Sequence, residues 1–154
     1  QTELPEGTEA TFDIVGNEAY VSIAAFTAQQ EAILVRQYRP GPERALVSFP
    51  EGYLDPNESP EEAGRRELLE ETGYQAKDIR VIRRLNRAYN TETRICLLAT
   101  GCHWVAEQQL DQSEFIEVFT LPLPDFRAYL RDTQQTDFTT IDIAYLSLDL
   151  LGWL

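Results

Sequence analysis

The sequence predicts an α/β (α+β) fold in which a mixed β-sheet lies between helices, as an α/β/α sandwich. Three observations predict it. Short apolar runs alternate with turn signals along most of the chain. One acidic segment carries the signals that start and end a helix. The composition of the 154 residues, 43% hydrophobic and 25% charged, is that of one globular domain.

We expect a single domain over residues 1–154, in which residues 1–18 form a loose N-terminal lead-in with one strand at 10–15. Six further strands are expected where turn residues bound apolar runs, at 20–26, 32–38, 45–49, 79–85, 94–100 and 115–121. Periodicity and cap signals predict helices at 60–72, 124–131 and 140–151. A mixed sheet covered by helices follows from this order.

The helix at residues 60–72 has the clearest boundaries. Ser59 is the expected N-cap, Pro60 takes the first helical position, and Glu62 closes a capping box. Gly73 supplies the residue that ends the helix. Gly64, inside the helix, is expected to cost about 1 kcal/mol of helix stability relative to alanine.

Three carboxylates share one face of this helix. Glu67, Glu70 and Glu71 have the i, i+3, i+4 spacing that places side chains side by side. Ala63 and Gly64 lie one turn earlier on that face, so their small side chains are expected to leave room for something to approach the helix closely. Like charges at this spacing repel one another. A hard cation that takes oxygen ligands, Mg²⁺ or Mn²⁺, would turn that repulsion into coordination.

The alternative is a solvated acidic helix face, which is common in a chain with a net charge of −13. Two details favour the metal site. Arg66 and Glu58 supply charges that would orient the carboxylates from outside, as partners of metal ligands do. The turn at residues 49–52 also comes just before the helix, where a backbone carbonyl would join the ligands.

The same segment resembles the Nudix box, G-x5-E-x7-R-E-U-x-E-E-x-G-U, in which U is a bulky aliphatic residue. Tyr74 is the one departure, because it stands at the last aliphatic position. Every other specified position is matched, by Gly52, Glu58, Arg66, Glu67, Leu68, Glu70, Glu71 and Gly73. The resemblance implies a Nudix-type fold and a metal-dependent hydrolase.

The resemblance also implies roles for individual residues. It assigns Mg²⁺ (or Mn²⁺) to the carboxylates of Glu67, Glu70 and Glu71 and to the backbone carbonyl of Glu51. Glu58 and Arg66 are implied to form an ion pair that holds the loop before the helix. These residues together make up the implied catalytic centre.

A second segment resembles one branch of the family. The run Leu-Val-Arg-Gln-Tyr-Arg-Pro at residues 34–40, followed by residues 49–52, is similar to the ADP-ribose pyrophosphatase branch. This likeness implies Mg²⁺-dependent hydrolysis, by attack of water at phosphorus, of the diphosphate of ADP-ribose or a similar nucleoside diphosphate sugar. Two alternatives stay open: a house-cleaning (d)NTP pyrophosphohydrolase, and a Nudix sensor domain that binds a nucleotide sugar without cleaving it.

Substrate contacts are expected from Arg39, with Arg36 as a second candidate, since guanidinium groups suit forked contacts to phosphate. The two point to opposite faces of a straight strand, so we expect one of them at the site. Glu114 is the candidate general base, by its resemblance to the second glutamate of an "E-x-E-x-I" segment. Gln112 replaces the first glutamate there. Residues that would stack on a base, or else pack in the core, are Tyr20, Tyr38, Tyr89, Trp104 and Phe115.

Charge and composition bear on partners and location. The pI near 4.4 argues against a nucleic-acid polymer and leaves a small-molecule nucleotide as the expected substrate. No apolar run approaches the roughly 18 residues of a membrane span. Two cysteines fit a reducing compartment, so a cytoplasmic location is expected, and Cys96 is expected in a buried strand. The family resemblance also allows a homodimer.

Overall fold

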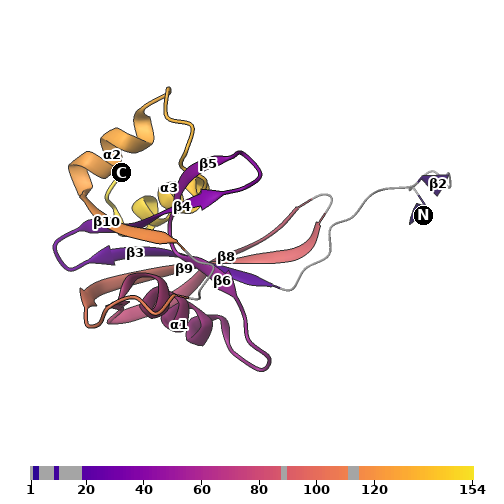
Figure 1. Ribbon diagram of the computed structural model, residues 1–154, viewed down its shortest axis with the longest axis horizontal. Coiled ribbons are helices and arrows are strands. Elements are labelled where there is room, and N and C mark those ends of the chain that lie inside the picture. The colour runs from indigo at the N-terminus through magenta and orange to yellow at the C-terminus, as the bar shows by residue number, and fades with distance from the viewer. Residues whose placement is uncertain (1, 4–8, 11–18, 88–89, 111–114) are drawn as a thin grey trace.

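The computed structural model describes residues 2–3, 9–10, 19–87, 90–110 and 115–154. Figure 1 shows the elements in chain order. The strands are β1 (Thr2–Glu3), β2 (Glu9–Ala10), β3 (Tyr20–Thr27), β4 (Glu31–Arg39), β5 (Arg44–Ser48), β6 (Glu51–Tyr53), β7 (Tyr74–Gln75), β8 (Asp78–Arg87), β9 (Asn90–Trp104) and β10 (Ile116–Pro122). The helices are α1 (Pro60–Thr72), α2 (Leu123–Arg131) and α3 (Ile141–Leu151).

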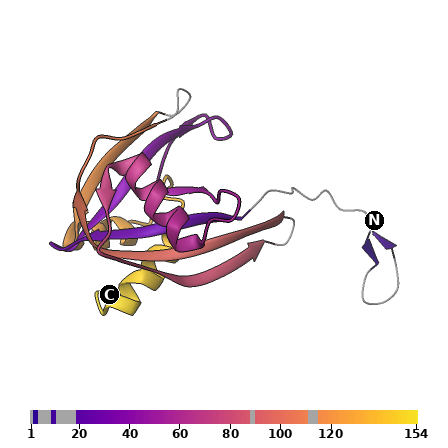
Figure 2. The same cartoon turned by 90° about the horizontal axis from the view of Figure 1, so that it is seen from below.

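The main sheet is mixed. Its strands follow the order β10-β4-β3-β9-β7, with β5 paired to β4, β6 to β3 and β8 to β9. The β3–β9 pair is parallel and the others are antiparallel. Helix α1 covers one face of the sheet, and α2 and α3 cover the other (Figures 1 and 2). The predicted mixed sheet between helices is therefore confirmed.

Each face of the sheet carries its own core because side chains alternate along a strand. On β3, Val21, Ile23 and Ala25 pack toward α1, while Ala24 and Phe26 pack toward α2 and α3. All five are fully buried. A strand buried on both faces reads as a continuous apolar run, which is the pattern that predicted it.

The predicted elements match the observed ones most closely where local signals are strong. The helix predicted at 60–72 is α1, with both hydrogen bonds of the capping box present. β9 is longer than predicted, because it continues through a register shift before Cys102 instead of ending at Thr100. The short strands β6 and β7 were not predicted. Of the strand expected at 10–15, residues 11–15 lie outside the described part of the chain.

Two further expectations concern burial and length. Cys96 lies in β9 and is buried, as predicted. Among the described residues, no helix has the length and apolar character needed to cross a membrane.

What approaches the helix closely at Ala63 and Gly64 is the sheet. Ala63 is fully buried in the core between α1 and the sheet. A Cβ on Gly64 would overlap the side chain of Leu97 and come within 2.9 Å of Ile79 Cδ1. The sheet itself therefore occupies the space that the small residues provide, and Gly64 lets α1 lie close to β8 and β9.

This packing predicts that Gly64→Ala destabilises the protein. Alanine gains about 1 kcal/mol of helix propensity, but overpacking a filled core costs about 1–3 kcal/mol. We expect a net loss of about 1 kcal/mol, measured as a lower midpoint of urea unfolding. Gly41→Ala is the control, because a Cβ at Gly41 would meet nothing within 4 Å. A Gly64→Ala protein more stable than the wild type would contradict the packing argument.

Candidate functional site

A cavity of about 460 Å³ opens beside strand β6 and helix α1. Five of the residues expected to bind metal, contact substrate or take part in catalysis line it: Arg39, Glu51, Arg66, Glu67 and Glu71. The other lining residues are Tyr20, Gln37, Gly52, Tyr53, Asp55 and Glu92. The fold thus brings the end of β4, strand β6 and one face of α1 to a single hollow.

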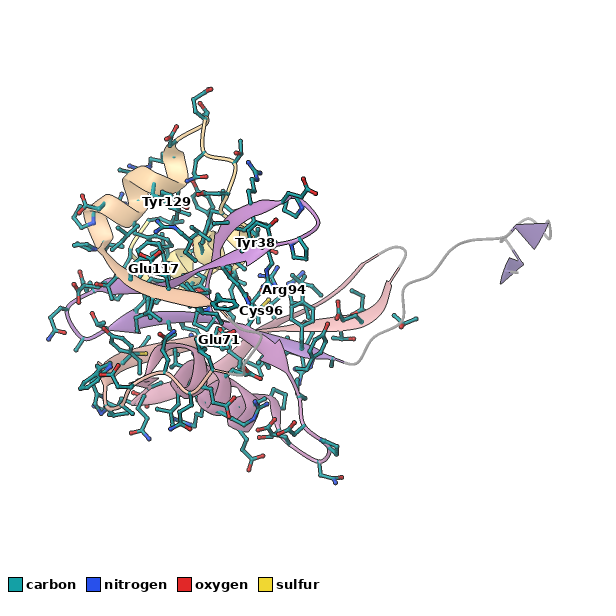
Figure 3. The ribbon with its side chains drawn as sticks, viewed as in Figure 1. Tyr38, Glu71, Arg94, Cys96, Glu117 and Tyr129 are labelled. Carbon is teal, nitrogen blue, oxygen red and sulfur yellow. The ribbon has the colours of Figure 1, made fainter. Side chains whose placement is uncertain are left out.

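The carboxylates of Glu67 and Glu71, on α1, lie against the backbone of β6. Glu71 is 8% exposed, and its Oε2 accepts a hydrogen bond of 3.2 Å from the backbone N–H of Glu51. Glu67 lies over the next residue, since a Cβ on Gly52 would overlap its carboxylate. Figure 3 shows Glu71 where α1 meets the sheet. A side chain at position 52 would therefore displace the Glu67 carboxylate from its place over β6.

Arg66 ties the loop before α1 to the helix. Its Nε and Nη2 each donate a hydrogen bond of 2.9 Å to the carboxylate of Glu58, and Nη2 also donates to the Tyr53 carbonyl at 2.8 Å. Its Nη1 reaches Glu67 at 2.7 Å and Glu70 at 3.2 Å. The expected Glu58–Arg66 ion pair is present, and its hydrogen bonds hold the pKa of Glu58 below the ordinary value.

The Glu51 side chain faces away from α1. Glu51 pairs with Ser22 across β6 and β3, so the two side chains share a face of the sheet. On that face, Glu51 Oε1 lies 3.8 Å from Nε of Arg94. Burial raises the pKa of Glu51, and the charge of Arg94 opposes this rise.

Of the predicted acidic residues, Glu51, Glu67 and Glu71 therefore line the cavity, and Glu58 and Glu70 do not. Within the described residues, no three His, Cys, Asp or Glu side chains are gathered as a metal-binding cluster. Glu67 and Glu70 each contact Arg66, and Glu71 contacts the β6 backbone.

The two candidate arginines of β4, Arg36 and Arg39, lie at different sites, as the alternation of side chains along a strand predicts. Arg39 lines the cavity. Arg36 does not. Its guanidinium pairs with Glu117 at 2.9 Å and lies 4.9 Å from the centre of the Phe119 ring. Arg36 instead borders a groove beside β10 that includes Tyr38 and Phe115.

The general base candidate, Glu114, lies outside the described residues, as does Tyr89. Glu117, three residues further along the chain than Glu114, is paired with Arg36 and does not line the main cavity.

Sequence reasoning missed four of the cavity residues, which are Gln37, Tyr53, Asp55 and Glu92. Gln37 and Tyr53 were within reach, because each is two positions from a residue already selected on the same strand. Tyr20 was selected only as an aromatic residue, and it packs edge-on against Tyr53 at 6.2 Å. Glu92 accepts a hydrogen bond of 3.2 Å from the Tyr53 hydroxyl. Burial, and then this contact, raise the pKa of Tyr53.

Comparison with known proteins identifies the family. The model of the NUDIX domain matches residues 16–140. The chain belongs to the Nudix family. This confirms the resemblance drawn from the box at residues 52–74, and the protein is a Nudix hydrolase.

Two curated relatives span most of this Nudix hydrolase. An ADP-ribose pyrophosphatase of Bacillus subtilis (strain 168) is 34% identical over 150 residues, which cover 95% of this chain and 81% of that protein. A methanol dehydrogenase activator of Bacillus methanolicus is 29% identical over the same length and coverage. The crystal structure of an ADP compounds hydrolase superposes with a TM-score of 0.75 at 23% identity, over 99% of this chain and 85% of that one. That structural likeness shows the fold.

Nudix hydrolases generally use divalent metal ions, and the residues at the cavity fit such an ion. Glu67 and Glu71 bring carboxylate oxygens to two successive residues of β6. Oxygen donors of this kind are those that hard divalent cations take. The missing Cβ of Gly52 leaves the space that Glu67 uses.

We therefore expect Gly52→Ala to displace Glu67 and to weaken Mn²⁺ binding by more than about tenfold, since one carboxylate would leave its place. Titration calorimetry with Mn²⁺ measures the effect, with Gly41→Ala as the matched control. Thermal unfolding checks that the fold is kept. Unchanged Mn²⁺ affinity in a folded Gly52→Ala protein would show that the position of Glu67 does not matter.

Proposed function

We propose that this Nudix hydrolase is a Mg²⁺-dependent pyrophosphohydrolase that cleaves the diphosphate of ADP-ribose or a similar nucleoside diphosphate sugar. One observation carries the proposal: a single cavity has Arg39 on one wall and the carboxylates of Glu67 and Glu71 on another. A phosphate-binding cation and a set of oxygen ligands are the two parts that such a reaction needs. The relative named ADP-ribose pyrophosphatase supports this substrate class.

The residues that would hold the metal are Glu67, Glu70 and Glu71, with the backbone carbonyl of Glu51. When bound, a divalent ion there lowers the pKa of a coordinated water and offsets the charge of the diphosphate. Glu114 is the residue we propose to accept the proton of the attacking water. Attack at phosphorus forms one P–O bond, breaks the bridging P–O bond, and yields two phosphate monoesters.

The remaining side chains bind and orient the substrate. Arg39 offers forked N–H donors to phosphate oxygens. Gln37 and the Tyr53 hydroxyl add neutral polar groups on the same side of the cavity, and the rings of Tyr20 and Tyr53 provide apolar surface beside them. Arg66 has a positioning role, because its donors are already engaged by carboxylates and a carbonyl.

A substrate panel with Mg²⁺ tests the proposal. ADP-ribose, other sugar nucleotides and dNTPs are compared by their products. We expect AMP and ribose 5-phosphate from ADP-ribose, or the corresponding monophosphates from another nucleotide sugar. Preferential dNTP cleavage would support the house-cleaning alternative, and nucleotide-sugar binding without turnover would support the sensor alternative.

Glu71→Gln should lower turnover in this panel by at least about 100-fold, because a buried anionic ligand becomes a neutral amide. Glu61→Gln, the same change on the same helix away from the cavity, should keep wild-type activity. Circular dichroism checks that both proteins are folded. Near wild-type turnover by a folded Glu71→Gln protein would show that Glu71 does not belong to the catalytic centre.

The two arginines of β4 form a matched pair for the phosphate contact. Arg39→Ala should raise KM for the best substrate by about tenfold or more, the loss of a charge-assisted hydrogen bond. Arg36→Ala should leave KM nearly unchanged, since Arg36 is held by Glu117 outside the cavity. Equal KM changes in both variants would contradict this assignment.

A further inference from the structure

Arg94 is a buried arginine that the proposed chemistry does not use. It lies in β9 and is 7% exposed. Its Nη1 donates to both carboxylate oxygens of Asp142, in the first turn of α3, at 2.9 and 3.0 Å. Its Nη2 donates to Ser22 Oγ at 3.2 Å. Three elements far apart in the sequence therefore meet at one guanidinium, which Figure 3 shows near the centre of the molecule.

One donor of Arg94 is left without a hydrogen bond. Its Nε is buried and has no hydrogen-bond partner among the described residues. The carboxylate of Glu51 is paired with this atom at 3.8 Å. Buried donors normally find an acceptor, so the guanidinium is oriented with its free donor toward Glu51. Asp142 and Ser22 fix that orientation from the other side.

Glu51 connects this cluster to the cavity. Glu51 lines the cavity, and its backbone N–H donates a hydrogen bond to Glu71. Arg94 itself does not line that cavity and lies behind Glu51. The guanidinium of Arg94 therefore meets a residue of the cavity wall at Glu51.

The charge of the cavity shows why this matters. Its lining contains two arginines and five carboxylates. Arg66 is already paired with the glutamates around it, which leaves Arg39 to face a substrate. A diphosphate is itself anionic, so every uncompensated carboxylate at the wall opposes its binding. The same carboxylates favour a divalent cation.

We propose that Arg94 is a positioning residue for this site, which acts by fixing the Glu51 carboxylate and cancelling its charge. The inference rests on the proposed diphosphate substrate. Removing Arg94 leaves a more negative wall, which binds a cation more tightly and a polyanion less tightly. Removing the charge of Glu51, or of Asp142 behind Arg94, has the opposite effect on both. A residue needed only for folding would shift both affinities in the unfavourable direction.

The test uses three variants, Arg94→Met, Glu51→Gln and Asp142→Asn. Mn²⁺ dissociation constants are measured by calorimetry without substrate, and KM is measured with the best substrate at saturating Mg²⁺. Arg94→Met should bind Mn²⁺ about threefold to tenfold more tightly and show a KM higher by a similar factor, the range for one charge across a partly solvated cavity. Glu51→Gln and Asp142→Asn should weaken Mn²⁺ binding and lower KM. Arg94→Lys should lie closer to the wild type than Arg94→Met.

The controls make the same charge changes elsewhere. Arg84→Met removes an exposed cation of β8, and Asp149→Asn removes an exposed carboxylate of α3. Both should leave the Mn²⁺ affinity and KM unchanged. In the double variant Arg94→Met with Glu51→Gln, the Mn²⁺ dissociation constant and KM should return toward their wild-type values, because one positive and one negative charge are removed together.

Several results would overturn the proposal. Weaker Mn²⁺ binding together with a higher KM in all three variants would show that Arg94 has a structural role alone. An Mn²⁺ dissociation constant and a KM that stay at their wild-type values in all three would show the same. If Arg94→Met does not fold, the direction of change in Asp142→Asn and Glu51→Gln decides. If the wild type cleaves none of the substrates in the panel, the proposed function is wrong. The Mn²⁺ dissociation constants of the variants still test the role of Arg94 in that case, because they are measured without substrate.

Discussion

The site depends on how closely helix α1 lies against strand β6 and the sheet behind it. Gly64 removes a side chain where the helix meets Leu97, and Gly52 removes one where Glu67 meets the strand. Carboxylates at i, i+4 spacing repel by only a few tenths of a kcal/mol. Burial of one leucine such as Leu68 contributes about 1.5–3 kcal/mol. Packing therefore outweighs repulsion and holds the acidic face in place.

Arg66 complements this packing on the loop side. Its hydrogen bonds to Glu58 and to the Tyr53 carbonyl bring the loop before α1 back onto the helix. A planar guanidinium with several donors in fixed directions suits such a junction better than a lysine does. Those donors are engaged, and the other arginine that lines the cavity, Arg39, comes from strand β4.

The Nudix fold does not by itself select a substrate. Relatives that align over the same length carry the names ADP-ribose pyrophosphatase and methanol dehydrogenase activator. Function on a shared fold is set by the residues grafted onto it. In this chain the box contributes the acidic wall of the cavity. Strands outside the box contribute the wall formed by Tyr20, Gln37, Arg39 and Glu92.

The sequence by itself determined the features that depend on neighbours along the chain. The capping signals set the limits of α1, the i, i+3, i+4 spacing placed its glutamates together, and strand alternation separated Arg36 from Arg39. The reaction class followed from the same local pattern, since the box is contiguous.

Only the tertiary structure decided which distant residues complete the site. Arg94 and Ser22 are 72 positions apart and meet because β9 pairs in parallel with β3. Glu92 reaches Tyr53 because β9 and β6 both pair with β3. The space beside Gly64 was filled by the sheet, although the helix alone left it open. Strand order and register set these contacts, and they arise from burial of both sheet faces rather than from any local signal.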